Sequence, residues 1–213
     1  MKKTTVCRKT ILKSLLFIVA FFGITSMGAQ VTFKPGVRAG INFAHFTEGN
    51  SFYNGQGNYT TYDNNGKAFS SKTDFYAGIY GALHLTKHYT LQPEITYSNQ
   101  GAIYNYIPFD DNASRSTRLN VSYLSTAIIN KFYFNKFNFH VGPTIDFVVD
   151  KNYAVENDVD FAFVLGAGYD ITPNFGIEAR VKKGIVPTIS DNYANDHTNV
   201  VFSIGVTYTF NTK

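Results

Sequence analysis

Apolar and polar residues alternate with a period of two along most of the chain after about residue 36. In the last segment, one face carries Val200, Phe202, Ile204, Val206, Tyr208 and Phe210, and the other carries Val201, Ser203, Gly205, Thr207 and Thr209. Such alternation is typical of half-buried β-strands. It recurs at about 36–43, 75–85, 89–98, 137–147, 161–171 and 175–182. The segment 119–134 is less regular and predicts a bulge near Ser125, so that eight strands are expected in all.

The connections between these segments alternate in length. Short links at 86–88, 135–136 and 172–174 consist of turn-forming residues, whereas long polar links lie at about 47–72, 103–118, 151–159 and 186–199. This asymmetry is typical of outer-membrane barrels, which have short periplasmic turns and longer extracellular loops. The predicted fold is therefore all-β, an eight-stranded antiparallel up-and-down transmembrane β-barrel.

Alternation alone does not say which face is outside, and a soluble lipocalin-like barrel that binds an apolar ligand is the alternative. Two features favour lipid outside. The polar face is rich in glycine, which suits the narrow lumen of an eight-stranded barrel. Aromatic residues also gather beside the short turns, as in a girdle at a membrane interface. The predicted girdle consists of Tyr89, Phe137, Phe139, Tyr169, Phe175, Tyr208 and Phe210.

The polar face also carries charges of both signs, which can pair in a confined lumen. The predicted lumen network consists of Arg38, Gln92, Glu94, His140, Asp146, Asp170, Glu178, Arg180 and Lys182. We expect a structural plug, because eight strands leave little room for a pore. A lining for an ion or solute path is the alternative.

The first 29 residues have the three parts of a secretory signal: a basic start, an apolar run at 15–24 and small residues before Gln30. We expect cleavage there, leaving 30–213 as the barrel domain; a retained N-terminal anchor is the alternative. The whole chain carries a net charge of +4, but five of its nineteen basic residues precede Gln30 and none of its fifteen acidic residues do. The remainder has a net charge of −1, which argues against a nucleic-acid partner. The single cysteine, Cys7, would leave with the signal.

Five segments in order resemble the PorT-like outer-membrane β-barrel family. They are Gly36–Phe43, Leu91–Gly101, His140–Pro143, Leu165–Tyr169 and Val206–Phe210. Two departures suggest a divergent member: residues 123–128 lack the proline that usually follows Tyr-Leu, and Arg180-Val181 stands where an Arg-Tyr pair is usual. The resemblance implies architecture and an outer-membrane location. It implies a role in secretion or gliding-type machinery only weakly.

No catalytic, cofactor or metal site is expected. The nearest candidate for a lipid-modifying enzyme is His197 with Ser190, Asp191 and Asp196, but loop polarity explains these residues equally well. His84 and His88 flank a turn without a zinc-binding spacing. We therefore expect a non-enzymatic, monomeric barrel in outer-membrane lipid, whose loops contact envelope or secretion proteins. A small-solute porin is the main alternative.

Overall fold

A computed structural model describes residues 31–47, 59–60, 69–108, 115–155, 157–186, 189–190 and 196–211. The described residues form eight long strands: β1 (Thr32–Phe46), β3 (Phe69–His84), β4 (Tyr89–Pro108), β5 (Arg115–Phe134), β6 (Phe137–Lys151), β7 (Val159–Asp170), β8 (Phe175–Gly184) and β11 (Asn199–Thr209). Three two-residue strands accompany them: β2 (Tyr59–Thr60), β9 (Ile189–Ser190) and β10 (Asp196–His197). No helix in the described part of the chain is long and apolar enough to cross a membrane.

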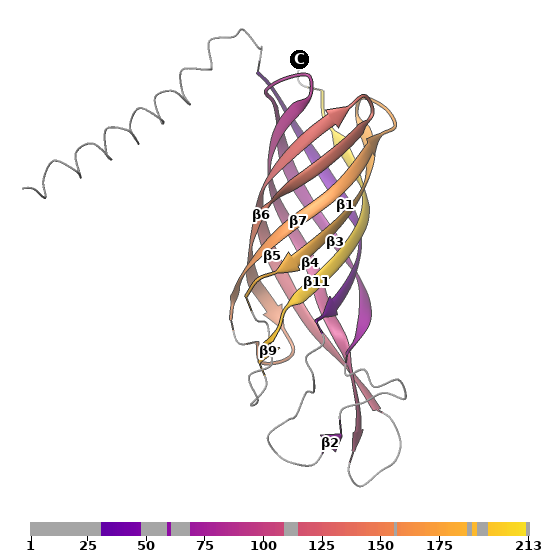
Figure 1. Cartoon of the computed structure of the whole chain (residues 1–213), viewed down its shortest axis with the longest axis vertical. Helices are drawn as coiled ribbons and strands as arrows, with labels where there is room; N and C mark the ends of the chain where they lie inside the picture. The colour runs from indigo at the N-terminus through magenta and orange to yellow at the C-terminus, as the bar shows by residue number, and fades with distance from the viewer. Residues whose placement is uncertain are drawn as a thin grey trace, which may run out of the picture. The chain divides into compact units, whose positions relative to one another are not determined.

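The eight long strands form a closed antiparallel barrel (Figure 1). Around the ring their order is β4, β3, β1, β11, β8, β7, β6 and β5, and β5 pairs with β4 to close it. Consecutive strands along the chain are therefore neighbours, and the last strand pairs with the first. The up-and-down topology expected from the alternation is confirmed, as are the eight strands.

The strands are strongly staggered around the ring. Starting from Phe33 in β1 and moving from each residue to its paired partner, the path returns to β1 at Phe43, ten residues further along. A stagger of this kind requires tilted strands, at about 35–45° to the axis in known barrels. The interior of an eight-stranded barrel is then just wide enough for side chains to fill.

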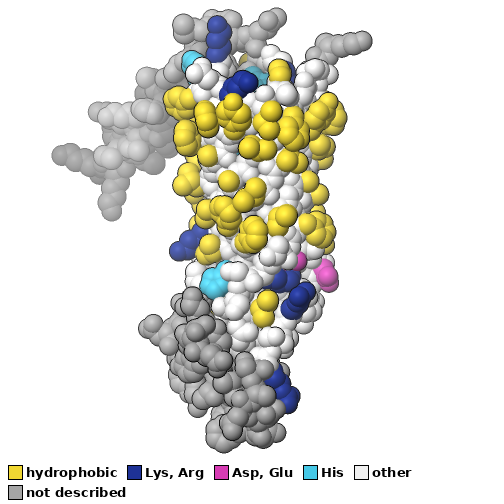
Figure 2. Space-filling model, turned by 90° about the vertical axis from the view of Figure 1, so that its right-hand side faces the viewer, with side chains coloured by type: hydrophobic (Ala, Val, Ile, Leu, Met, Phe, Trp, Pro, Cys, Tyr) yellow, Lys and Arg dark blue, Asp and Glu magenta, His cyan; other side chains and the backbone are white. Residues whose placement is uncertain are grey.

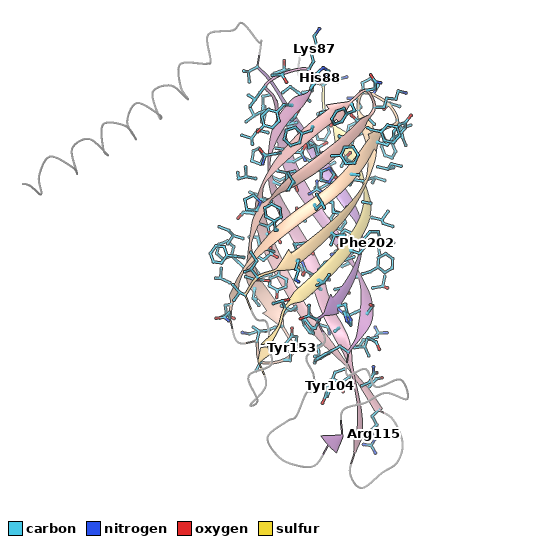
Figure 3. All side chains as sticks on the ribbon, viewed as in Figure 1. Lys87, His88, Tyr104, Arg115, Tyr153 and Phe202 are labelled. Atoms are coloured by element: carbon cyan, nitrogen blue, oxygen red, sulfur yellow. The ribbon has the colours of Figure 1, made fainter. Side chains whose placement is uncertain are left out.

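The two ends of the barrel differ. Residues 85–88, 135–136 and 171–174 join strands at one end, which we call the short-turn end. Asn135 has a φ of 57°, a left-handed conformation that asparagine tolerates and that lets the chain reverse after β5. The opposite end, where the other connections lie, is called the long-loop end. Lys87 and His88 lie at the first and Tyr104, Arg115 and Tyr153 toward the second (Figure 3).

Two sequence expectations were wrong in detail. The link at 103–118 is mostly strand, because Ala102–Tyr106 in β4 pairs with residues 115–119 in β5, and only 109–114 fall outside the described residues. The bulge expected near Ser125 is absent there. The register of β5 and β6 instead shifts between Ser122 and Tyr123, where β6 carries one extra residue, Val149. The odd-numbered face of β5 therefore points inward without interruption, and Tyr123 is buried inside the barrel.

The outer wall of the barrel is apolar. Large hydrophobic side chains project outward from every long strand, including Ile41 in β1, Ile79 in β3, Leu165 in β7 and Ile204 in β11. On the face that Figure 2 shows, hydrophobic side chains gather in a broad belt, and most of the coloured charged side chains and histidines lie near its margins. On β6, Phe137 and Phe147 both face outward, ten residues apart. At roughly 3.3 Å per residue and the tilt above, this separation corresponds to an apolar band of about 25 Å, as in transmembrane barrels.

Candidate functional site

Four charged side chains meet in the middle of the lumen, and we call them the charge quartet: Arg38, Glu94, Glu178 and Arg180. Arg180 Nη1 and Nη2 each donate to one oxygen of the Glu94 carboxylate at 2.8 Å, and Nη2 also donates to Glu178 Oε2 at 2.9 Å. Arg38 donates to the same two carboxylates, at 3.0 Å to Glu94 Oε2 and 2.6 Å to Glu178 Oε1. All four side chains are at least 90% buried. Each cation therefore bridges both anions, and the site is electrically balanced.

The alternation of the strands explains why these residues meet. Arg38 comes from β1, Glu94 from β4 and the other two from β8, and each lies on the inward face of its strand. β4 and β8 are both two strands away from β1 in the ring, so the side chains converge across the lumen. Gln92 Nε2 donates to Glu94 Oε1 at 2.7 Å, and the Tyr76 ring lies 4.6 Å from the Arg38 guanidinium. These neighbours satisfy and cover the charges, as buried ions require.

The other predicted lumen residues form separate groups. Lys182 pairs with Asp146, which also accepts a hydrogen bond from Thr144 Oγ1 at 3.2 Å. The imidazole of His140 is buried, with Nδ1 3.1 Å from Asn138 Oδ1 and no hydrogen-bond partner for Nε2 among the described residues. Asp170 lies apart at the short-turn end of the lumen. The nine predicted residues all lie on the inner face, but only five of them belong to one connected network.

Glycines make room for large side chains inside the barrel. A Cβ on Gly36 would meet the ring of Tyr80, and a Cβ on Gly205 would meet the hydroxyl of Tyr76. Both tyrosines are buried in the lumen. The glycine-rich inner face therefore fits aromatic rings, and little open space remains. The cavities found there measure about 50 Å³ beside the quartet and 90 Å³ at the short-turn end.

A substitution at Gly166 tests this packing. In a Gly166→Ala variant, the new methyl group would meet the imidazole of His140 and lie 2.7 Å from the carbonyl oxygen of Ala179. We expect a loss of about 1–3 kcal/mol in the free energy of unfolding, the usual cost of overpacking. Gly176→Ala is the control, because its nearest atoms are side-chain oxygens of Thr207 and Asp170 at 2.9 and 3.0 Å. Equal urea midpoints for the two variants, read from gel mobility, would contradict the packing described.

An apolar cluster closes the long-loop end of the lumen, and we call it the aromatic cap. Phe46, Phe69 and Ala102 are almost completely buried, and Tyr104, Leu119 and Tyr153 pack against them. The rings of Phe46 and Phe69 meet edge to face with centroids 5.5 Å apart, and Tyr153 lies 6.3 Å from Phe46. Burial raises the pKa of the Tyr153 phenol, whose hydroxyl has no hydrogen-bond partner among the described residues. The cap therefore excludes water from this part of the lumen.

Sequence reasoning missed several lumen residues. Lys131 is 95% buried with its ammonium group 5.8 Å from the Tyr80 ring, and it lines the short-turn cavity. It was overlooked because the supposed bulge near Ser125 obscured which face of β5 points inward. Phe46 was overlooked because it lies next to a long polar link, although it shares the even-numbered face of Arg38 and Asn42. A consistent alternation from Arg38 onward was the available signal.

The predicted girdle residues lie at the short-turn end. Phe137 contacts Tyr169 with ring centroids 4.8 Å apart, and Tyr208 contacts Phe210 at 5.3 Å. Phe139 and Phe175 are exposed on the same wall, and Tyr89 donates its hydroxyl to Asn130 at 2.7 Å. Further outward aromatics lie nearer the long-loop end and were not predicted. They form the pairs Phe43–Phe202 and Phe75–Tyr97, each with centroids 6.2 Å apart.

Catalytic chemistry has little support in the described residues. The side chains of Ser190, Asp196 and His197 and the whole of Asp191 lie outside the described residues. Within the described part of the chain, no group of three or more His, Cys, Asp or Glu side chains is placed to hold a metal ion. His84 Nδ1 lies 2.8 Å from Thr90 Oγ1.

Comparisons with known proteins agree with this geometry. A family model described as "Outer membrane protein beta-barrel domain" matches residues 28–190. Among solved structures, Neisserial surface protein A is similar with a TM-score of 0.50 and 14% identity over 83% of this chain and 97% of that one. OprG from Pseudomonas aeruginosa has a TM-score of 0.46 and 13% identity over 85% of this chain and 98% of that one. The Yersinia pestis attachment invasion locus protein Ail has a TM-score of 0.44 and 11% identity over 83% of this chain and 98% of that one. No curated protein sequence matches the chain. At such identities the first of these structures supports the fold alone.

Proposed function

Since the chain belongs to the outer membrane protein beta-barrel domain family and lies in the bacterial outer membrane, we propose that it is a sealed, non-enzymatic barrel that presents its long loops to a protein partner. Residues 1–29 are the cleaved export signal in this proposal. The short turns then face the periplasm, and the long loops face outward.

The observation that carries the proposal is the closure of the lumen at two levels. The charge quartet fills the middle, and the aromatic cap fills the long-loop end. A barrel filled in this way acts as a membrane anchor, and the surface left for a partner is the set of connections at the long-loop end. The link at about 47–72 is rich in Tyr, Asn and Gly, residue types that suit adaptable recognition loops. The structural role of the quartet is to fix strand register and hold the lumen shut.

We also propose that the chain is a divergent PorT-like barrel, and that its protein partner belongs to a secretion complex. The five sequence segments given above support this affiliation. The missing proline after Tyr123-Leu124 and the Arg180-Val181 pair weaken the transfer of the secretion role.

Deletion of residues 50–67, which ends before β3 and spares Phe69 of the aromatic cap, tests the proposed function. In the bacterium that makes the protein, we expect the deleted variant to reach the outer membrane and keep its heat-dependent gel shift, but to lose chemical cross-links to envelope proteins. The control shortens no loop and replaces the turn residues 86–88 by Gly, Asn and Gly at the opposite end of the barrel. Identical cross-linking patterns for the wild type and the loop deletion would reject the proposal.

A conducting lumen is the second candidate, favoured by the two small cavities beside the quartet and at the short-turn end. We expect no current steps above the lipid background when the wild-type protein is reconstituted in planar bilayers. The Tyr153→Ala variant should also be silent, because the quartet still blocks the lumen when the cap is weakened. Steady single-channel steps from the wild type would favour a porin instead.

A further inference from the structure

The outer wall is hollowed by a groove of about 570 Å³ across β4, β5, β6 and β7. Its lining is almost entirely apolar. Pro93, Thr126 and Pro143 project little from the wall, whereas Phe161, Phe163 and Ile185 border the groove with large side chains. A volume in the range of about 300–1,000 Å³ is typical of sites that hold a small organic ligand.

The groove follows the hydrogen-bonding direction of the sheet. Its floor runs along paired residues, from Glu94 through Ala127 and Thr144 to Ala162, and the next partner of Ala162 is Gly184 in β8. Glu94 lies five residues from the short-turn end of β4, whereas Gly184 lies nine residues from the short-turn end of β8. The groove therefore runs from the middle of the apolar belt toward the long-loop end.

A lysine lies beside the end of this groove that is nearer the long loops. Lys183 in β8 is exposed and pairs with Phe163, one of the residues that border the groove. It makes no hydrogen bond or ion pair with any part of the chain that the structure describes. A cation on a lipid-facing strand is stable near the membrane interface, where it can meet an anionic headgroup.

From these features we infer that the groove holds one acyl chain of an anionic, phosphate-bearing lipid of the outer leaflet, with its phosphate group against Lys183. An extended, apolar and diagonal groove fits a single acyl chain. Because the lining is almost entirely apolar, the headgroup must lie at an end of the groove, and Lys183 marks which end. A second copy of the barrel fits less well, because its convex wall would not fill the hollow between Phe161 and Phe163 and would leave Lys183 unpaired.

Brominated lipids can test this assignment, because bromine on an acyl chain quenches nearby tryptophan and the chain has no tryptophan of its own. Phe161→Trp places a reporter in the groove. Phe75→Trp is the matched control: it is similarly exposed, lies nine residues from the short-turn end of its strand as Phe161 does, and belongs to β3, opposite β7 in the ring. Each variant is reconstituted in phosphatidylcholine vesicles with a small fraction of brominated phosphatidic acid or brominated phosphatidylcholine that carries the same acyl chains.

We expect about a five-fold preference for the brominated phosphatidic acid at Phe161→Trp, the effect of one well-placed lysine. No preference is expected at Phe75→Trp or when Lys183→Gln is added to Phe161→Trp. Filling the groove with Thr126→Phe should reduce quenching of Phe161→Trp by both lipids. Equal quenching by the two lipids at Phe161→Trp, or a preference that survives Lys183→Gln, would overturn the inference. Disulfide-linked dimers of a Thr126→Cys variant in the same vesicles would also overturn it, in favour of a second copy. The heat-dependent gel shift establishes that each variant is folded.

Discussion

An Arg180→Met variant should lose about 3–5 kcal/mol in the free energy of unfolding, the usual result of removing one partner from a buried ion pair. Arg180 makes two hydrogen bonds to Glu94 and one to Glu178, and its side chain is 95% buried. Methionine has a similar length but no charge. The two carboxylates would then share only Arg38, and one negative charge would remain uncompensated in a space that water can barely enter.

Urea titration of the refolded protein in lipid vesicles measures this loss, with the folded fraction read from gel mobility. Lys151→Met is the control, because Lys151 pairs with Asp158 at 2.6 Å on the exposed surface, where an ion pair contributes about 1 kcal/mol at most. Adding Glu94→Gln to Arg180→Met should restore part of the lost stability, since it removes the excess charge. If Arg180→Met and Lys151→Met lowered stability equally, the quartet could not be the register-fixing element proposed here.

The sequence was sufficient to predict the fold because most strands carry large apolar side chains on the outward face and mainly polar or small ones on the inward face. The alternation from Val200 to Phe210 corresponds closely to β11, and the turn residues at 135–136 lie where β5 reverses into β6. Successive residues of a strand point alternately outward and inward, and this alternation correctly assigns Ile204 to the wall and Arg180 to the lumen. The closed ring leaves no free strand edge, so a period-two pattern over eight segments with short turns has few other solutions.

What the sequence could not provide was the relative height of the strands. Arg38, Glu94 and Arg180 are far apart in the chain, and their meeting depends on the ten-residue stagger around the ring. The register also decides which residues of neighbouring strands line the groove, among them Pro93, Thr126 and Pro143. The aromatic cap was missed for a different reason, because Phe46 and Tyr153 lie beside polar links whose composition predicts loops and not packing.

The second large effect is expected at Ile204, on the outer wall of the last strand. Ile204 is 50% exposed in the barrel and pairs with Ile41 and Ala179, both within the apolar belt. In Ile204→Arg, a charged side chain would project from this wall into the acyl chains. A cationic residue costs about 2–4 kcal/mol at the midplane of a bilayer and much less near its interfaces. We therefore expect the variant to fold poorly in vesicles and to accumulate outside the outer membrane in cells.

Ser203→Asn is the matched control, since the neighbouring side chain points the other way. The hydroxyl of Ser203 donates to Asn42 Oδ1 at 2.7 Å and lines the small cavity beside the quartet, so a larger polar side chain has a partner and some space. We expect this variant to keep its heat-dependent gel shift with only a modest change in urea midpoint. The opposite ranking, with Ser203→Asn more damaging than Ile204→Arg, would mean that the even-numbered face of β11 does not contact lipid. Paired residues on neighbouring strands point to the same side of the wall, so that result would reverse the inside and outside of every strand.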